Sequence, residues 1–596
     1  MTETPSPEAL QKEIGEFAEQ SQRAVQSFWQ RQLTEQAEGG FSLVDPSAVS
    51  KAFFDFGAKL MADPTKLAEA QMAFWQGQAD LWQRMMQRAQ GGEAEPLIEP
   101  ERGDRRFKDQ AWDDQLLFDY IKQSYLLSAA WMHGLVDKVD HQDPETHERV
   151  AFYTRQFISA MSPSNFALTN PAVLEKAKAT GGQNLVEGLK HLLADLERGK
   201  GRLKISMVDE QAFEVGVNVA ASEGQVIYQN ELMQLVQYAP TTETAFKRPL
   251  LLVPPWINKF YILDLQPKNS FIKHAVDQGH TVFVVSWANP SKEHADKAFE
   301  DYLLEGPLEA MAAIEQATGE REINVLGFCI GGILVSALLG HLAAKGEGGR
   351  IKSATFLTSL FDFNDVGEAR VFIDDEQIAQ IERHIAEKGY LEGHHMADMF
   401  SMMRENDLIW SFVVNNYLMG REPMAFDLLY WNADSTRLPA AMLIFYLKTF
   451  YQQNLLREPG GLTLAGTPID LTSVKTPTYL MAAKDDHIAP WKSCYPGTQL
   501  FAGPKKFVLA ASGHIAGVVN PPGAKKYGHW TNAKLPKEAD AWLDGAEWHD
   551  GSWWPDWYRW LARKAGKKVP ARVVGEGKLK PIEPAPGSYV KVRVSE

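Results

Sequence analysis

Cysteine is scarce in this sequence: among 596 residues there are two, Cys329 and Cys494. Two thiols cannot form a disulfide framework, and these two lack the paired spacing typical of a zinc site. The first residues are acidic and include no basic segment followed by an apolar one, so no signal peptide is expected. The sequence therefore predicts a cytoplasmic protein with no metal and no structural disulfide.

Positive charge is also in short supply. The chain has 61 Lys and Arg residues against 76 Asp and Glu residues, and its formal net charge is -15. Binding to nucleic acid requires clustered Lys and Arg side chains that neutralise phosphate groups. Such residues gather only toward the C-terminal tail, which we delimit as 567–596. A nucleic-acid partner is therefore not expected.

Long apolar runs are rare, and one uncharged run, 323–344, reaches the length of a membrane-spanning helix. Several glycines interrupt it, together with Asn324, Ser336 and His341. This composition favours a strand, a tight turn and a buried helix in succession. No transmembrane segment is expected.

The sequence divides into regions with different hydrophobic periodicity. Residues 1–204 show helical spacing, and the run 63–88 begins with Asp63 as a predicted N-cap and Pro64 as the first helical residue. We predict a helical N-terminal domain over 1–204. Its apolar faces pack against neighbouring helices or, alternatively, bind a partner or a hydrophobic particle.

Beyond residue 205, short β-branched runs alternate with helical stretches, which predicts βαβ units and a parallel sheet covered on both faces. The predicted strands are 250–253, 281–287, 323–328, 353–358, 477–483 and 506–510. A Met-rich and aromatic stretch, 361–455, interrupts this pattern and predicts a helical cap over the carboxyl ends of the strands, where α/β proteins bind ligands. The predicted catalytic domain spans 205–566.

The segment Gly327-Phe-Cys329-Ile-Gly331 lies between a predicted strand and a predicted helix. This is the pattern of a nucleophile elbow, in which a sharp turn presents the nucleophile and small flanking residues relieve crowding. The positive end of the following helix favours the thiolate form of a cysteine at this position. The alternative is a small buried apolar cysteine. We predict that Cys329 is a nucleophile.

The order of the remaining chemical groups fits the α/β-hydrolase fold, which supplies a nucleophile, then an acid, then a histidine. Asp486 follows the predicted strand 477–483, and His514 lies in the loop after 506–510. The sequence therefore predicts the triad Cys329, Asp486 and His514.

Neighbouring residues provide alternatives to these assignments. Asp485 is a second candidate for the acid, and His487 is a second candidate for the base. Because side chains of consecutive residues diverge, we expect His487 to have a structural or supporting role beside Asp486. Cys494 is not part of an elbow and is predicted to be non-catalytic.

An oxyanion hole in this fold takes one backbone N–H from the residue after the nucleophile and one from the loop after an earlier strand. Ile330 supplies the first. The loop 254–258 supplies the second, and because its prolines have no N–H, Trp256 or Ile257 is the predicted donor. Asp264 is predicted to position substrate, with a structural hydrogen-bonding role as the alternative.

The sequence resembles the polyhydroxyalkanoate synthases, most closely the class I type that acts on short-chain substrates. The similar stretches are DRRFKDQAW (104–112), SPSNFALTNP (162–171), GQNLVEGL (182–189), PPWINKFYILDLQPKNS (254–270), GFCIGG (327–332), FDLLYWNADSTRLP (426–439), DDHIAPW (485–491) and SGHIAGVVNPP (512–522). The resemblance implies that Cys329 carries the acyl group, that His514 is its base and that Asp486 is the third member. It also implies a homodimer on polyester granules, where granule-associated proteins are further partners.

A cysteine suits such chemistry, because transfer from a CoA thioester to a thiol keeps the acyl group activated for later attack by a hydroxyl. We therefore predict an acyltransferase without a cofactor that polymerises (R)-3-hydroxyacyl-CoA, in particular 3-hydroxybutyryl-CoA, and releases CoA. Either His514 or Asp486 is the base for elongation. The alternatives are a thioesterase or esterase with the same triad, and a non-enzymatic protein that coats granules.

Overall fold

The computed structural model describes residues 46–139 and 144–594. These residues divide into two compact units, which we call the helical unit (46–139, 144–209 and 398–424) and the sheet unit (210–397 and 425–594). The part of the predicted helical domain before residue 46 lies outside the described residues.

The first unit is helical, as its periodicity predicts. Helix α3 begins at Pro64, and the Asp63 side chain caps it by accepting a hydrogen bond from the N–H of Lys66 at 3.1 Å. Leu81 and Met85 lie on the buried face of this helix. The helices of this unit are α2 (Pro46–Ala62), α3 (Pro64–Ala89), α4 (Ala111–Asp114), α5 (Leu116–Lys138), α6 (Pro144–Ala160), α7 (Pro171–Thr180) and α8 (Gln183–Arg198).

The stretch 361–455, which the sequence predicts as one cap, is divided between the two units. Its central part, 398–424, belongs to the helical unit. There the buried carboxylate of Glu405 accepts hydrogen bonds from Ser159 Oγ at 2.8 Å and from Gln156 Nε2 at 3.2 Å. A buried carboxylate needs such partners, and helix α6 supplies them. This part includes most of α14 (Gly393–Met403), η8 (Asn406–Trp410) and η9 (Val413–Leu418).

The sheet unit is built on an eleven-stranded sheet in the order β15-β14-β13-β12-β7-β6-β4-β5-β2-β1-β17. Its central strands are parallel, and all of the strands predicted from the sequence are among them. Those strands are β4 (Leu250–Val253), β5 (Val282–Trp287), β6 (Ile323–Phe328), β7 (Ile351–Leu357), β12 (Thr478–Ala483) and β13 (Lys505–Ala510). Every residue of β4, β5, β6 and β12 is buried, as expected for strands covered on both faces.

The edges of the sheet are antiparallel and were not indicated by the hydrophobic pattern. They comprise β1 (Gly224–Gln229), β2 (Met233–Tyr238), β14 (His529–Thr531), β15 (Glu547–His549) and β17 (Glu583–Pro584). The segment predicted as a separate tail, 567–596, contributes β17 and also β16 (Lys568–Pro570), which pairs with β3 (Thr244–Phe246). Backbone pairing, which requires no apolar run, thus makes this segment part of the sheet unit.

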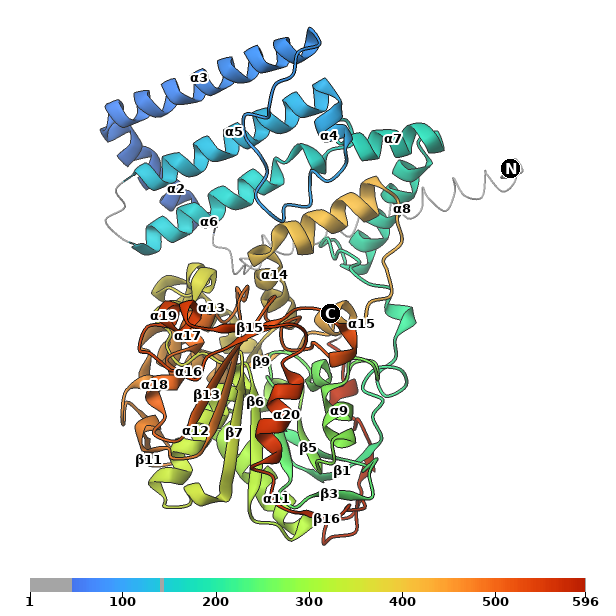
Figure 1. Ribbon diagram of the computed structural model, residues 1–596, viewed down its shortest axis with the longest axis vertical. Coiled ribbons are helices and arrows are strands. Elements are labelled where there is room, and N and C mark those ends of the chain that lie inside the picture. Colours follow the sequence, from blue (N-terminus) through green and yellow to red (C-terminus); the bar gives the residue numbers. More distant parts are fainter. Residues whose placement is uncertain (1–45, 140–143, 595–596) are drawn as a thin grey trace, which may run out of the picture. The chain divides into compact units, whose positions relative to one another are not determined.

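Helices cover the sheet, and α12 and α20 lie beside its strands (Figure 1). The uncharged run 323–344 consists of β6, Cys329 and the buried helix α12, which confirms the predicted strand, turn and helix. Trp557 of α20 donates a hydrogen bond from Nε1 to Thr355 Oγ1 of β7 at 2.9 Å. None of the helices that the structure describes is both long enough and apolar enough to span a membrane.

The remaining helices and strands of the sheet unit complete its layers. They are α9 (Phe271–Asp277), α10 (Phe299–Leu303), α11 (Glu309–Thr318), α12 (Ile330–Ala344), α13 (Asp375–Lys388), β8 (Tyr390–Leu391), α15 (Asp427–Ala433), β9 (Leu438–Pro439), α16 (Ala440–Tyr446), β10 (Leu462–Leu464), β11 (Thr467–Ile469), α17 (Trp491–Cys494), α18 (Gly497–Leu500), α19 (Ala539–Asp544) and α20 (Trp554–Ala562).

Candidate active site

Cys329 occupies a sharp turn between β6 and α12. Its backbone angles are φ 54° and ψ −124°, a conformation that residues with a side chain rarely adopt. The N–H of Cys329 donates to the carbonyl of Leu357 in the neighbouring strand β7 at 2.8 Å, which holds the turn in place. This is the geometry of a nucleophile elbow.

The glycines beside Cys329 are required by close backbone packing. A Cβ atom at Gly327 would lie 2.4 Å from the Cα of Gly332, and one at Gly331 would lie 2.2 Å from the carbonyl oxygen of Val253. Both distances are far shorter than real contacts. The loop after β4 therefore packs directly against the elbow because Gly331 has no side chain.

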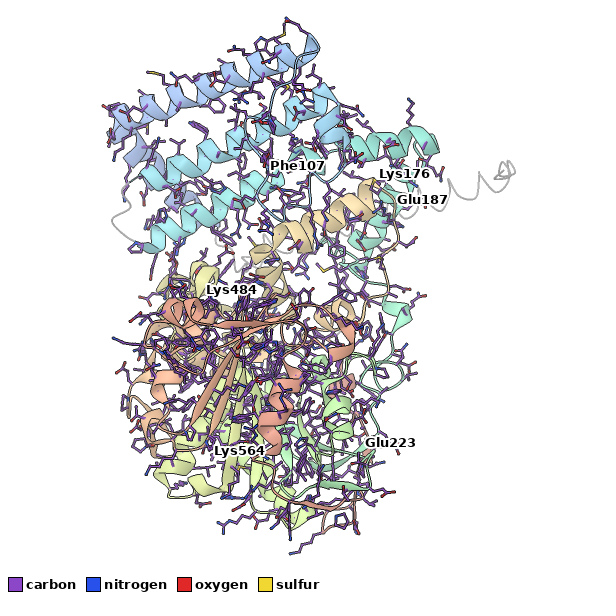
Figure 2. The ribbon with its side chains drawn as sticks, in the orientation of Figure 1. Phe107, Lys176, Glu187, Glu223, Lys484 and Lys564 are labelled. Carbon is purple, nitrogen blue, oxygen red and sulfur yellow. The ribbon has the colours of Figure 1, made fainter. Side chains whose placement is uncertain are left out.

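Asp486 and His514 are joined by a hydrogen bond at the carboxyl ends of β12 and β13. Lys484, labelled in Figure 2, is the first residue after β12, and Asp486 follows it closely. His514 Nδ1 donates to Asp486 Oδ2 at 2.7 Å. The other carboxylate oxygen, Oδ1, accepts from the N–H groups of Ile488 at 2.8 Å and Ala489 at 2.9 Å. Both oxygens are thus occupied, and the imidazole is held in one orientation.

The imidazole of His514 also interacts with Cys329. Burial alone lowers the pKa of a histidine, but the charge of Asp486 and the interaction with the Cys329 sulfur outweigh it and raise the pKa of His514 to about 10. The ring of Phe328 stacks on the imidazole with centroids 5.6 Å apart. The structure therefore brings Cys329, Asp486 and His514 into one connected set.

The alternatives considered from the sequence occupy other positions. Asp485 is exposed, and its N–H donates to the carbonyl of Ser512 at 3.0 Å. His487 is partly buried beside Asp486, but the hydrogen bond to Asp486 comes from His514. Cys494 is buried at the end of α17, where burial raises the pKa of its thiol well above the usual value.

The predicted oxyanion donors lie on two elements that meet at the elbow. Ile330 is the first residue of α12, where a backbone N–H has no carbonyl partner within the helix. Trp256 and Ile257 lie in the loop after β4. Their carbonyl oxygens are 2.9 Å and 2.5 Å from the hydroxyl of Thr436, a residue from a later part of the chain. The Trp256 ring is buried against Tyr302, with centroids 4.9 Å apart. This loop is fixed on both sides.

Thr436 belongs to a segment, 431–436, that is bonded to the loop after β4 at several points. Lys259 and Asp434 form a buried ion pair at 2.7 Å, and Tyr261 donates its hydroxyl to Asp434 at 2.9 Å. Trp431 Nε1 donates to the carbonyl of Lys259 at 2.7 Å. Sequence reasoning missed these positions, although polar residues within the aromatic stretch 426–439 were a signal.

Two family models match the chain. The model described as the poly-beta-hydroxybutyrate polymerase (PhaC) N-terminus matches residues 103–275, and the model of the alpha/beta hydrolase fold matches residues 248–521. The chain is 49% identical over 534 residues to a poly(3-hydroxyalkanoate) polymerase of Methylorubrum extorquens, covering 89% of this chain and 88% of that protein.

Two further relatives, named poly(3-hydroxyalkanoate) polymerase subunit PhaC, are each 45% identical to the chain. The protein of Rhizobium meliloti aligns over 98% of this chain and 95% of its own length, and that of Cupriavidus necator over 89% of each. The chain belongs to the poly(3-hydroxyalkanoate) polymerase family. The resemblance drawn from the motifs and the predicted α/β-hydrolase fold are thereby confirmed, and a polymerase of this kind is a transferase.

Asp264 of this polymerase has the surroundings of a structural residue. It is buried, and its Oδ1 accepts hydrogen bonds from Ser222 Oγ and Ser270 Oγ, each at 2.6 Å. Burial raises the pKa of its carboxyl to about 6, although the two serine bonds oppose that rise. Ser270 is the N-cap of α9. Asp264 thus joins this helix to the chain before β1, which is the alternative role considered above.

Aromatic residues form a wall beside Cys329 of the polymerase. Burial, and to a smaller extent the nearby Cys329 sulfur, raises the pKa of both Tyr446 and Tyr451 above the usual value. Phe450 lies between these two tyrosines in the sequence, and its ring centroid is 5.2 Å from that of Tyr446. These residues come from the part of the predicted cap that belongs to the sheet unit. Tyr446 and Tyr451 thus lie near Cys329, and Phe450 is buried beside Tyr446.

Proposed function

We propose that this polymerase joins (R)-3-hydroxyacyl-CoA units, in particular 3-hydroxybutyryl-CoA, into a polyester through an acyl group carried on Cys329, with release of CoA. The observation that supports this proposal most directly is the connection of the elbow cysteine to His514, which is itself bonded to Asp486. The names of the relatives support the class of product. The reaction needs no cofactor, because the CoA thioester is already activated.

In the first step, His514 holds the proton that the Cys329 thiol gives up, which agrees with the raised pKa of its imidazole, and the sulfur attacks the thioester carbonyl. The N–H of Ile330 and an N–H of Trp256 or Ile257 stabilise the oxyanion. The carbon–sulfur bond to CoA then breaks, and His514 returns its proton to the leaving CoA sulfur. The acyl group is now a thioester of Cys329, so its activation is retained.

In the second step, a hydroxyl group attacks the acyl group on Cys329, and the thiol is released as the ester forms. The hydrogen bonds of Asp486 favour His514 as the base for this step. Asp486 Oδ1 accepts two backbone N–H groups and Oδ2 accepts His514 Nδ1, and the side chain of Asp486 is 0% exposed, so a substrate hydroxyl has no open path to the carboxylate. Nε2 of His514 is the ring nitrogen that is not bonded to Asp486, and it is the group that can take the proton.

A thioesterase with the same triad would carry out the first step and then admit water. The aromatic wall of Tyr446, Phe450 and Tyr451 favours transfer over hydrolysis, because bulky rings beside Cys329 reduce the space open to water. Incubation of the purified protein with 3-hydroxybutyryl-CoA tests the proposal. We expect insoluble polyester in proportion to the CoA released, and soluble free acid as the main product would contradict it.

The same preparation tests the associated proposals. From the family resemblance we propose a homodimer that works on the surface of polyester granules. Sedimentation of the full-length protein should show a dimer, and separation of the polyester should carry the protein with it. A series of CoA thioesters with increasing acyl length should show the highest turnover with the shortest 3-hydroxyacyl groups.

A further inference from the structure

Three side chains with metal-binding atoms meet in the sheet unit, at the point where α13 ends and α14 begins. They are His384, Glu392 and His395, and one ligand atom of each lies within 4.8 Å of the others. Oε2 of Glu392 is 3.0 Å from Nε2 of His384 and 3.8 Å from Nε2 of His395. The same carboxylate oxygen therefore faces both imidazoles.

The local fold explains why residues on two helices converge here. Helix α13 ends at Lys388, and Gly389 follows in the left-handed conformation with φ 80°. The chain then forms the short strand β8 and returns toward the helix that it has just left. A Cβ at Gly389 would lie 2.8 Å from Cβ of Ala295, so the turn has little room for another residue. This turn places Glu392 beside His384.

We propose that His384, Glu392 and His395 bind a Zn²⁺ ion. Zinc binds nitrogen and oxygen ligands at about 2.0–2.1 Å in tetrahedral geometry, which places neighbouring ligand atoms about 3.3 Å apart. The separations of 3.0 and 3.8 Å lie on either side of that value. Two imidazoles with one carboxylate also favour zinc over magnesium or calcium, which prefer oxygen ligands.

The surroundings orient the carboxylate and leave the three side chains partly exposed. Lys388 forms an ion pair with Oε1 of Glu392, the carboxylate oxygen that does not face the two imidazoles. Metal-binding carboxylates are commonly oriented by such an outer hydrogen bond. The three side chains are 12% to 17% exposed, which allows water to complete the coordination. Bound zinc would fix the start of α14 to the end of α13.

The test uses full-length protein with Cys329→Ala, so that the nucleophilic thiol cannot bind the metal. After removal of metals with a chelator, Zn²⁺ is titrated by calorimetry, and Co²⁺ is added as a spectroscopic probe. We expect one high-affinity ion per chain and the visible absorption of four- or five-coordinate Co²⁺. His384→Ala or His395→Ala should abolish both signals. Lys388→Met should weaken binding by about 10-fold.

The matched control is His133→Ala, which removes an exposed histidine on α5 and should leave binding unchanged. If a variant fails to fold, a chemical measurement on the protein that retains His384, Glu392 and His395 provides an independent test. Zn²⁺ should protect His384 and His395, but not His133, from acylation by diethyl pyrocarbonate. The proposal is overturned if the protein binds no Zn²⁺, or if folded His384→Ala binds it as tightly as the parent protein.

Discussion

The regions around the two cysteines show how differently one fold treats the same side chain. Cys329 is on a strained turn after β6 and interacts with His514. Cys494 ends α17, where its Sγ lies 3.6 Å from the carbonyl oxygen of Ala489. The two sulfurs are close enough that Cys329 adds to the rise in the pKa of Cys494 that burial causes. Proximity to the site is therefore not sufficient: the turn and the imidazole distinguish the proposed nucleophile, Cys329, from Cys494.

The largest effect should come from replacing each cysteine by alanine in a separate variant and comparing the two rates. Cys329→Ala removes the only sulfur held by the elbow and should lower CoA release by at least about 10⁴-fold. Cys494→Ala, its matched control, should retain activity. Both are measured as the rate of CoA release from 3-hydroxybutyryl-CoA. Near-normal release by Cys329→Ala would end the proposed role of the elbow.

A smaller loss is expected when the imidazole loses its carboxylate. Asp486→Asn removes the charge that orients His514 and raises its pKa, and we expect kcat to fall on the order of 10³-fold. Asp485→Asn changes the exposed neighbour and should have little effect. The same loss in both variants would show that the assignment of the acid is wrong.

A substitution at Thr436 tests whether residues outside the triad hold the loop after β4 in position beside Cys329. Thr436→Val removes the hydroxyl near the carbonyls of Trp256 and Ile257, and kcat should fall by about tenfold. Thr436→Ser retains the hydroxyl and should restore most of the rate. If the two variants are equally impaired, the methyl group rather than the hydrogen bond is what matters.

The pH dependence of the free energy of unfolding should report on His514, which interacts with Cys329. The folded-state pKa of His514, about 10, is above its ordinary value of 6.5, so protonation stabilises the folded protein. This stabilisation is complete below pH 6.5 and is lost as the pH rises toward 10, with a slope of at most about 1.4 kcal/mol per pH unit. Chemical denaturation of His514→Gln should lack this contribution. Parallel curves for the two proteins would contradict the raised pKa.

The smallest effect is expected at the second cysteine. Cys494→Ala leaves a small cavity in a buried position and should lower the free energy of unfolding by about 1 kcal/mol. Thermal unfolding measures this change, and iodoacetamide provides a complementary comparison in the native protein. The reagent should modify Cys329 rapidly and Cys494 slowly. Rapid modification of Cys494 would mean that its burial is not maintained in solution.

The central strands and the position of the triad residues could be predicted because local signals specify them. Apolar runs such as 250–253 mark strands that are buried on both faces, and the glycines around Cys329 mark a turn that has no space for side chains. Asp486 and His514 could be placed at strand ends by their order in the chain. Each of these inferences requires only neighbours in sequence.

The edge strands, the division of 361–455 and the segment 431–436 could not be predicted in the same way. Strands β1 and β17 pair residues that are more than 300 positions apart, through backbone groups that every residue possesses. Glu405 is separated by 246 positions from Ser159, whose hydroxyl it requires. From residue type alone, a charged residue is predicted to lie on the surface, and only knowledge of its partner shows that it is buried.

The sequence by itself determined the family, the central parallel strands and the identity of the elbow, because these depend on residue types and short spacings. Tertiary structure alone decided which acid bonds to His514, which segment fixes the loop after β4, and that His384, Glu392 and His395 lie together. The physical reason is the short range of hydrogen bonds and metal coordination. Such contacts depend on separations of a few ångströms, which the folded chain sets and the order of residues does not.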